Sequence, residues 1–169
     1  MKLLITREIP QSGINLLQKY PKIEIDYRKG KPLTPKELTE AMENVDAVIP
    51  IIPDRITEEM IKSSKKLKVI ATYSVGFDHI DTVAATKHGV YVANTPGDLT
   101  ESVAEFTIAL MMAVTKNITA SDNFCREKKF KYWEPMNFIG PKLKGKTLGV
   151  VGLGRIGQQT AMIARQGLE

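Results

Sequence analysis

The sequence predicts an α/β protein built on a parallel sheet, and three observations support this fold class. Short apolar runs alternate with longer stretches of helical spacing over the first part of the chain. The composition, 43% hydrophobic and 25% charged over 169 residues, is that of a globular protein. A glycine-rich turn joins an apolar run to a helical stretch near the end of the sequence. Strands that alternate with helices are joined by right-handed crossovers and therefore lie parallel.

The predicted elements of the first part follow one another regularly. The helix near residue 34 begins with a capping box, because Thr34 precedes Pro35 and Glu37 is the third helical residue. Two further helices are expected to begin at Thr57 and Asp81, and an earlier one follows the first strand. The predicted strands are short and apolar and span residues 3–6, 23–27, 47–49, 69–72 and 90–92.

The character of the sequence changes after residue 97. Residues 1–97 therefore form a first α/β domain, and residues 98–169 begin a second one. In the second part a helical pattern starts at residue 100 and is expected to run on to about residue 127. An irregular, basic segment follows, and residues 147–151 then read as a buried strand.

A G-x-G-x-x-G motif directly follows that strand and begins a helical stretch, which is the context that a dinucleotide site requires. Gly152 permits a tight turn, Gly154 allows the backbone to approach a pyrophosphate, and Gly157 allows close helix–strand packing. The amides of Arg155 and Ile156 lie at the positive end of the helix dipole. A turn that is glycine-rich by chance is the alternative; we favour a site for NAD or NADP. The acidic residue that binds the ribose is expected about 20 residues further on, after the last residue of this chain.

Composition excludes several other classes of function. No apolar run reaches the ~18 residues of a membrane span, and the N-terminal run is too short for a signal peptide. The single cysteine, Cys125, cannot form an internal disulfide, so we expect a cytoplasmic protein. His79 and His88 have no partners at metal-ligand spacing, so no metal is expected. The net charge of +5 includes a basic cluster between residues 126 and 146; nucleic-acid binding is one interpretation, but we favour a solvated loop.

Three motifs, in order, resemble the D-isomer-specific 2-hydroxyacid dehydrogenase family over the entire chain. Residues 73–81 (YSVGFDHID) are similar to the family's substrate-carboxylate loop. Residues 92–97 (VANTPG), followed by 102–105 (SVAE), are similar to its crossover between domains. Residues 152–157 (GLGRIG) are similar to its nucleotide fingerprint. The first motif is closest to those of glyoxylate/hydroxypyruvate reductases.

The resemblance implies a flavodoxin-like parallel-sheet substrate domain, followed by the first strand–helix unit of a Rossmann domain. It implies reversible hydride transfer between NAD(P)H and a small 2-oxo or 2-hydroxy acid. It also implies a homodimer through residues of about 100–145, where Trp133 is either part of the interface or buried under its own chain. The implied substrate-binding residues are Ile51, Ile52, Ser74, Val75 and Gly76, with the carboxylate on the amides of Val75 and Gly76, and Val103 is implied near the nicotinamide.

The sequence departs from the family pattern at the catalytic residues. The family's catalytic arginine, glutamate and histidine come after position 169, so no catalytic residue is assigned and the chain alone is expected to be inactive. Glu101 and Glu105 are interpreted as charges near a helix start, and His79 as a structural histidine of a loop. The alternatives to part of an enzyme are a non-enzymatic dinucleotide-sensing module and a dimerisation module.

Overall fold

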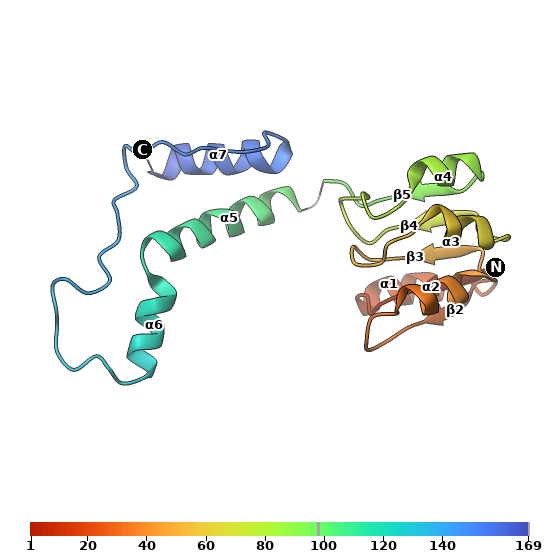
Figure 1. Cartoon of the computed structure of the whole chain (residues 1–169), viewed down its shortest axis with the longest axis horizontal. Coiled ribbons are helices and arrows are strands. Elements are labelled where there is room, and N and C mark those ends of the chain that lie inside the picture. The colour runs from red at the N-terminus through yellow and green to blue at the C-terminus, as the bar shows by residue number, and fades with distance from the viewer. Residues whose placement is uncertain (98, 169) are drawn as a thin grey trace. The chain divides into compact units, whose positions relative to one another are not determined.

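The computed structural model describes residues 1–97 and 99–168 (Figure 1). It divides into two compact units, Met1–Gly97 (unit 1) and Asp98–Glu169 (unit 2).

Unit 1 is built on one five-stranded sheet in which every neighbouring pair of strands is parallel. The order across the sheet is β2-β1-β3-β4-β5, which is the flavodoxin-like order that the family resemblance implied. The predicted α/β class is therefore confirmed. The strands are β1 (Lys2–Ile5), β2 (Glu24–Tyr27), β3 (Ala47–Ile49), β4 (Val69–Ala71) and β5 (Tyr91–Ala93).

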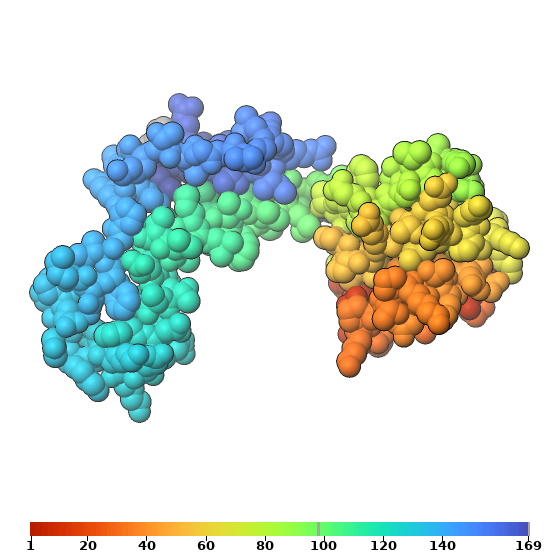
Figure 2. Space-filling view, viewed as in Figure 1, coloured from red at the N-terminus to blue at the C-terminus, as the bar shows by residue number. Residues whose placement is uncertain are grey.

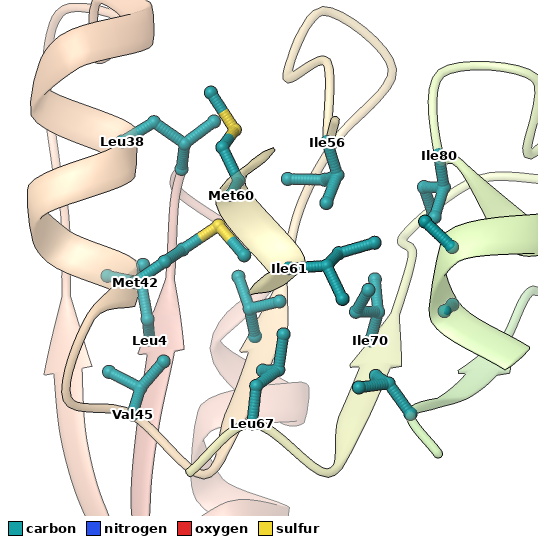
Figure 3. Close-up of a cluster of buried hydrophobic side chains, with 14 residues drawn as sticks. Leu4, Leu38, Met42, Val45, Ile56, Met60, Ile61, Leu67, Ile70 and Ile80 are labelled. Carbon is teal, nitrogen blue, oxygen red and sulfur yellow. The ribbon is translucent and has the colours of Figure 1, made fainter. Parts of the chain in front are cut away.

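Helices cover the two faces of the sheet, and alternate residues of β1 face them. Leu4 belongs to a large cluster with side chains of three helices, whereas Leu3 and Ile5 belong to a second cluster with Ile14. Figure 3 shows the large cluster, in which Met42, Ile61 and Ile70 are drawn among the labelled side chains. The second cluster involves α1 (Gln11–Leu17), and the large one involves α2 (Pro35–Met42), α3 (Glu58–Ser63) and α4 (Thr82–Lys87).

Side-chain caps begin three of these helices as the sequence predicts. The Thr34 hydroxyl accepts a hydrogen bond from the Glu37 amide at 3.3 Å, and the Glu37 carboxylate accepts from the Thr34 amide at 2.7 Å, which completes the capping box. Thr57 and Asp81 cap α3 and α4 by accepting from amides three residues later. Local chemistry thus fixes where these helices start.

The carboxyl ends of the strands form one edge of the sheet, and this edge positions the site. Because β2 and β3 lie on opposite sides of β1, the connections leave β1 in opposite directions, and the gap between the ends of β1 and β3 is a topological switch point. Thr6 and Pro50 follow these two strands, and Thr72 and Asn94 follow β4 and β5. Open α/β sheets bind ligands at this edge.

Over residues 99–168, unit 2 contains three helices, which are α5 (Thr100–Thr115), α6 (Ile118–Arg126) and α7 (Arg155–Leu168). The prediction of one continuous helix from residue 100 to about 127 is wrong. Asn117 adopts a left-handed conformation with φ of 54°, and the axes of α5 and α6 differ by 62°. Asparagine tolerates this conformation better than most residues, which explains the break.

The segment after α6 is irregular and folds back over that helix. Phe138 meets Phe124 edge to face with ring centroids 5.3 Å apart, and the side-chain amide of Asn117 donates to the Ile139 carbonyl at 3.4 Å. In Figure 2 the light-blue atoms of this segment lie against the cyan atoms of α6. Trp133 is 76% exposed, so burial under its own chain is wrong.

Residues 147–151 form no strand, and Val151 is fully exposed. The prediction of a buried strand is wrong for this chain, because a strand needs a neighbour for its hydrogen bonds and no other segment of the described residues pairs with 147–151. The helix expected after the glycine turn is present as α7, and it packs along α5 (Figure 1). Helix–helix contact thus replaces the sheet as the support of this segment.

The described residues offer neither a metal-ligand cluster nor a single membrane-spanning helix. Within 1–97 and 99–168, no group of three or more His, Cys, Asp or Glu residues is placed to hold a metal ion. Over the same ranges no single helix is long and apolar enough to cross a membrane, although α5 and α6 reach that length and composition as a bent pair.

Candidate functional site

The loop after β4, residues Thr72 to Phe77, lies at the carboxyl edge of the sheet. Thr72 continues the sheet pattern, because its amide donates to the Ala93 carbonyl at 2.8 Å. Thr72 and Ser74 are buried, whereas Val75 and Phe77 are 36% and 48% exposed. The loop therefore buries the side chains of Thr72 and Ser74, whereas the residues from Val75 on are exposed to solvent.

Two successive carbonyl groups of this loop are held by residues that follow β5. The Ser74 carbonyl accepts from the Thr95 amide at 2.9 Å, and the Val75 carbonyl accepts from the side-chain amide of Asn94 at 2.8 Å. All described peptide bonds are trans, so each N–H points away from the carbonyl of its own peptide unit. The amides of Val75 and Gly76 therefore point away from Asn94 and Thr95, and neither donates to an acceptor among the described residues.

A second set of hydrogen bonds supports the loop from inside. The Ser74 hydroxyl donates to the Gly76 carbonyl at 2.7 Å and lies 2.6 Å from the Thr72 hydroxyl. Nε2 of His79 lies 3.0 Å from the same Thr72 oxygen. Burial lowers the pKa of His79 below its ordinary value of 6.5, and the negative charges of Asp54 and Asp78 oppose this shift only in part. His79 is thus a neutral, structural member of the loop at pH 7.

The neighbouring loop after β3 is anchored on Asp54, which is 4% exposed. Its Oδ2 accepts hydrogen bonds from the Thr6 hydroxyl and, at 3.1 Å, from the Ile51 amide. The Tyr73 amide donates to the Pro50 carbonyl at 3.0 Å, so the loops after β3 and β4 are joined directly. In the loop after β3, Ile52 is 64% exposed and Ile51 is half-buried.

The predicted site residues of unit 1 differ in what they present. The amides of Val75 and Gly76 are free, as the assignment requires, but the Ser74 side chain faces inward and supports the loop. The turn itself does not require glycine at position 76, because its φ lies outside the left-handed region and a Cβ there would meet only a carboxylate oxygen of Asp78 at 3.8 Å.

The glycine turn of unit 2 has the geometry that its motif predicts. Gly152 has φ of 93°, which favours glycine, and a Cβ at Gly157 would collide with the Gly152 carbonyl oxygen. No heavy atom lies within 4 Å of where a Cβ of Gly154 would be, so a ligand can approach the backbone there. Arg155 and Ile156 open α7. The turn therefore fits the pyrophosphate of a dinucleotide.

Comparison with known families agrees with this geometry. Residues 3–164 match the family described as D-isomer specific 2-hydroxyacid dehydrogenase, catalytic domain. The chain belongs to this family. The predicted family resemblance is therefore confirmed.

The relatives of the chain include curated glyoxylate reductases. That of Thermococcus litoralis is 43% identical over 168 residues, covering 97% of this chain and 50% of the relative. That of Thermofilum pendens is 45% identical over 161 residues, covering 95% and 48%. A crystal structure from Thermus thermophilus superposes with a TM-score of 0.92 at 40% identity, covering 98% of this chain and 53% of that one. The chain thus spans about half the length of the relatives that it matches.

Two similar solved structures are described with nicotinamide dinucleotides. One is a D-lactate dehydrogenase from Aquifex aeolicus in complex with NAD and lactic acid, with a TM-score of 0.78 at 30% identity. The match covers 98% of this chain and 48% of the D-lactate dehydrogenase chain. The other is an acyclic imino acid reductase in complex with NADPH and D-Arg, with a TM-score of 0.81 at 30% identity, covering 98% of this chain and 53% of that one. Both forms of the cofactor therefore occur among the structural neighbours.

Sequence reasoning missed the residues that hold the loops in place. Asn94 lies in a motif that was singled out, but it was given no role, and Thr6, Asp54 and Thr72 were not considered. Three of them share a signal, which is position: Thr6 and Thr72 are the last residues of predicted strands, and Asn94 lies two residues after one. A search for polar residues at the carboxyl ends of predicted strands finds them.

Proposed function

We propose that this chain supplies the substrate-carboxylate loop and the pyrophosphate turn of an enzyme that transfers a hydride between NAD(P)H and a small 2-oxo or 2-hydroxy acid. The supporting observation is the pair of free amides at Val75 and Gly76, directed away from the end of β5 at the carboxyl edge of the sheet. Successive free amides form a site for a carboxylate. Glyoxylate and hydroxypyruvate are the preferred acids, since the relatives include glyoxylate reductases.

The backbone from Gly152 to Gly157 would hold the dinucleotide. Its open approach at Gly154 and the helix start at Arg155 and Ile156 suit a pyrophosphate, and the bound nicotinamide would supply or accept the hydride. Val103 lies on α5 at 36% exposure, and we keep it as a predicted contact of the nicotinamide. Both NAD and NADP remain candidate cofactors, because the neighbours include complexes of each.

We also propose a homodimer through residues of about 100–145. Apolar and aromatic side chains are exposed across this range in the single chain, and an interface would cover them. Those at least 59% exposed are Phe106, Val114, Phe130, Tyr132, Trp133, Met136 and Ile139.

The carboxylate loop is tested by titrating oxalate, and separately glyoxylate, into the ¹⁵N-labelled chain. Shifts are expected at the amides of Val75 and Gly76, with a dissociation constant in the millimolar range or weaker, because so few hydrogen bonds provide only ~4 kcal/mol. Gly76→Val is expected to abolish these shifts while the fold is kept, since position 76 has room for a side chain. Amides that stay still at 75 and 76 while others move would contradict the assignment.

A non-enzymatic dinucleotide-sensing module is the second candidate, and the glycine turn alone would serve it equally well. The two are distinguished by the carboxylate loop, because a dinucleotide sensor has no need of a 2-oxo acid site. Binding of a dinucleotide without any response to oxalate would favour the sensor.

A further inference from the structure

The carbonyl groups of the loop after β4 are held from two sides. On one side, Thr95 and Asn94 donate to the carbonyls of Ser74 and Val75. On the other side, the Ser74 hydroxyl donates to the third successive carbonyl, that of Gly76. We call these two sets of donors the clamp. Each carbonyl that binds to the clamp fixes the plane of its peptide unit and hence the direction of the amide in that unit.

From Ser74 the hydrogen bonds continue through the Thr72 hydroxyl to His79. Because each hydroxyl has one proton, the donor in each of these hydrogen bonds can be assigned. The Gly76 carbonyl can only accept, so the Ser74 hydroxyl uses its single proton there and accepts from Thr72 at 2.6 Å. Thr72 has then used its own proton; its contact to the Pro50 carbonyl is longer, at 3.4 Å. The Thr72 oxygen therefore accepts from Nε2 of His79 at 3.0 Å. The series of hydrogen bonds therefore donates from His79 to Thr72, from Thr72 to Ser74 and from Ser74 to Gly76, and the imidazole proton lies on Nε2.

We propose that Asn94 and His79 are positioning residues that aim the amides of the carboxylate loop, an inference that rests on the proposed function of that loop. Asn94 acts through the Val75 carbonyl, which belongs to the same peptide unit as the Gly76 amide. A carbonyl that accepts a hydrogen bond polarises its peptide unit, so the Gly76 amide becomes a stronger donor to an anion. Asn94 thus sets both the direction and the strength of that amide.

His79 acts at greater distance, through Thr72 and Ser74. Each of these two hydroxyls donates one hydrogen bond and accepts another, and hydrogen bonds linked in this way strengthen one another. The ring is half-buried, and its Nε2 proton is engaged with Thr72. His79 therefore holds the loop and does not exchange protons with a substrate.

The clamp is tested first without ligand, on the labelled chain as it is. Scalar couplings across hydrogen bonds are expected from the Thr95 amide to the Ser74 carbonyl carbon, and from the Asn94 side-chain amide to that of Val75. A long-range ¹H–¹⁵N spectrum at pH 7.5 is expected to place the proton of neutral His79 on Nε2. The chain has only one other histidine, His88, and His88→Gln identifies its signals. A proton on Nδ1 of His79, or no coupling to Val75, overturns the clamp.

The second test is oxalate titration of matched variants. Asn94→Ala removes the donor and Asn94→Leu removes it while keeping about the same side-chain size; each is expected to weaken oxalate binding about three- to tenfold, the effect of one hydrogen bond. Asn15→Ala, an exposed helix position that binds only Gln11, is the control with unchanged affinity. His79→Leu is expected to weaken binding as well, and His79→Gln to restore it, since its amide can donate to Thr72.

The outcomes separate this inference from the proposed function. If the unmodified chain shows no response to oxalate, the proposed function fails, and the ligand-free couplings and the His79 tautomer still decide the clamp. If the unmodified chain binds oxalate and the Asn94 variants bind it equally well, the clamp fails and the carboxylate loop stands. A well-dispersed amide spectrum of either Asn94 variant suffices for this comparison.

Discussion

The hydroxyl of Thr6, at the end of β1, donates a hydrogen bond to the carboxylate of Asp54, which lies 48 residues later in the loop after β3. This hydrogen bond connects the end of β1 to the loop after β3, on either side of the topological switch point. Because Asp54 also accepts from the Ile51 amide, its carboxylate sets the course of the loop that carries Ile51 and Ile52. The course of the loop that carries two of the predicted substrate-binding residues thus depends on a buried carboxylate.

Asp54→Ala is expected to destabilise unit 1 by about 1–3 kcal/mol, because it leaves the Ile51 amide without its acceptor and the Thr6 hydroxyl with only the Ile49 carbonyl at 3.2 Å. Asp54→Asn is expected to cost less, since its side-chain oxygen still accepts one hydrogen bond. The measurement is urea unfolding followed by far-UV circular dichroism. Asp122→Ala, which removes an exposed ion pair with Arg126 on α6, is the control and is expected to change stability by less than ~1 kcal/mol. Equal effects of the two alanine variants would contradict the role of Asp54.

The 169-residue chain is expected to show no dehydrogenase activity by itself. The family resemblance places the catalytic arginine, glutamate and histidine after position 169, and a general acid/base alone contributes ~10²–10⁴-fold to a rate. The assay combines the purified chain with glyoxylate, hydroxypyruvate or pyruvate, and with NADH or NADPH. Steady turnover above a blank without protein would show that the chain holds catalytic groups that the resemblance does not predict.

Acidification is expected to destabilise unit 1 through His79. Its pKa in the folded state is lowered by burial, so between that value and about 6.5 the unfolded chain binds a proton that the folded chain resists. The contribution of neutral His79 is therefore complete above about pH 6.5 and is lost as the pH falls below it. Melting temperatures between pH 8 and 5 are expected to fall more steeply for the unmodified chain than for His79→Gln. His88→Gln, at an exposed position, is the control, and parallel curves for all three proteins would refute the effect.

Local sequence signals predicted more of this fold than of its site. The capping box at Thr34 and the cap at Thr57 depend on residues three positions away, so their geometry follows from the sequence itself. The break at Asn117 is not visible in the sequence because helical spacing continues across it, and only the backbone angles of Lys116 and Asn117 depart from the helix. The hydrogen bond from Asn94 to Val75 joins residues 19 positions apart. Such contacts exist only once the sheet brings the ends of β4 and β5 together, so periodicity and spacing do not reveal them.

Residues after Gly152 are expected to be the least protected part of the chain. The apolar groove between α5, α7 and the segment before the glycine turn, about 490 Å³ in volume, is lined by side chains that no strand covers. Leu153 and Met162 are 63% and 46% exposed. Such apolar surface favours association or local opening. Amide hydrogen exchange in a dilute monomer measures this directly, and slow exchange over α7 there would count against the prediction.

The last prediction compares two glycines of one turn. A Cβ at Gly157 would collide with the carbonyl oxygen of Gly152, whereas a Cβ at Gly154 has no atom within 4 Å. Gly157→Ala must therefore shift α7 or the turn and is expected to destabilise that packing by about 1–3 kcal/mol. Gly154→Ala is expected to stay within ~0.5 kcal/mol of the unmodified chain, because the new methyl group points into open space. Amide exchange of α7 measures both, and the same methyl group at 154 would obstruct a pyrophosphate approaching the backbone. If both variants increase the amide exchange of α7 equally, the close contact between Gly157 and Gly152 is not what holds α7 against the turn.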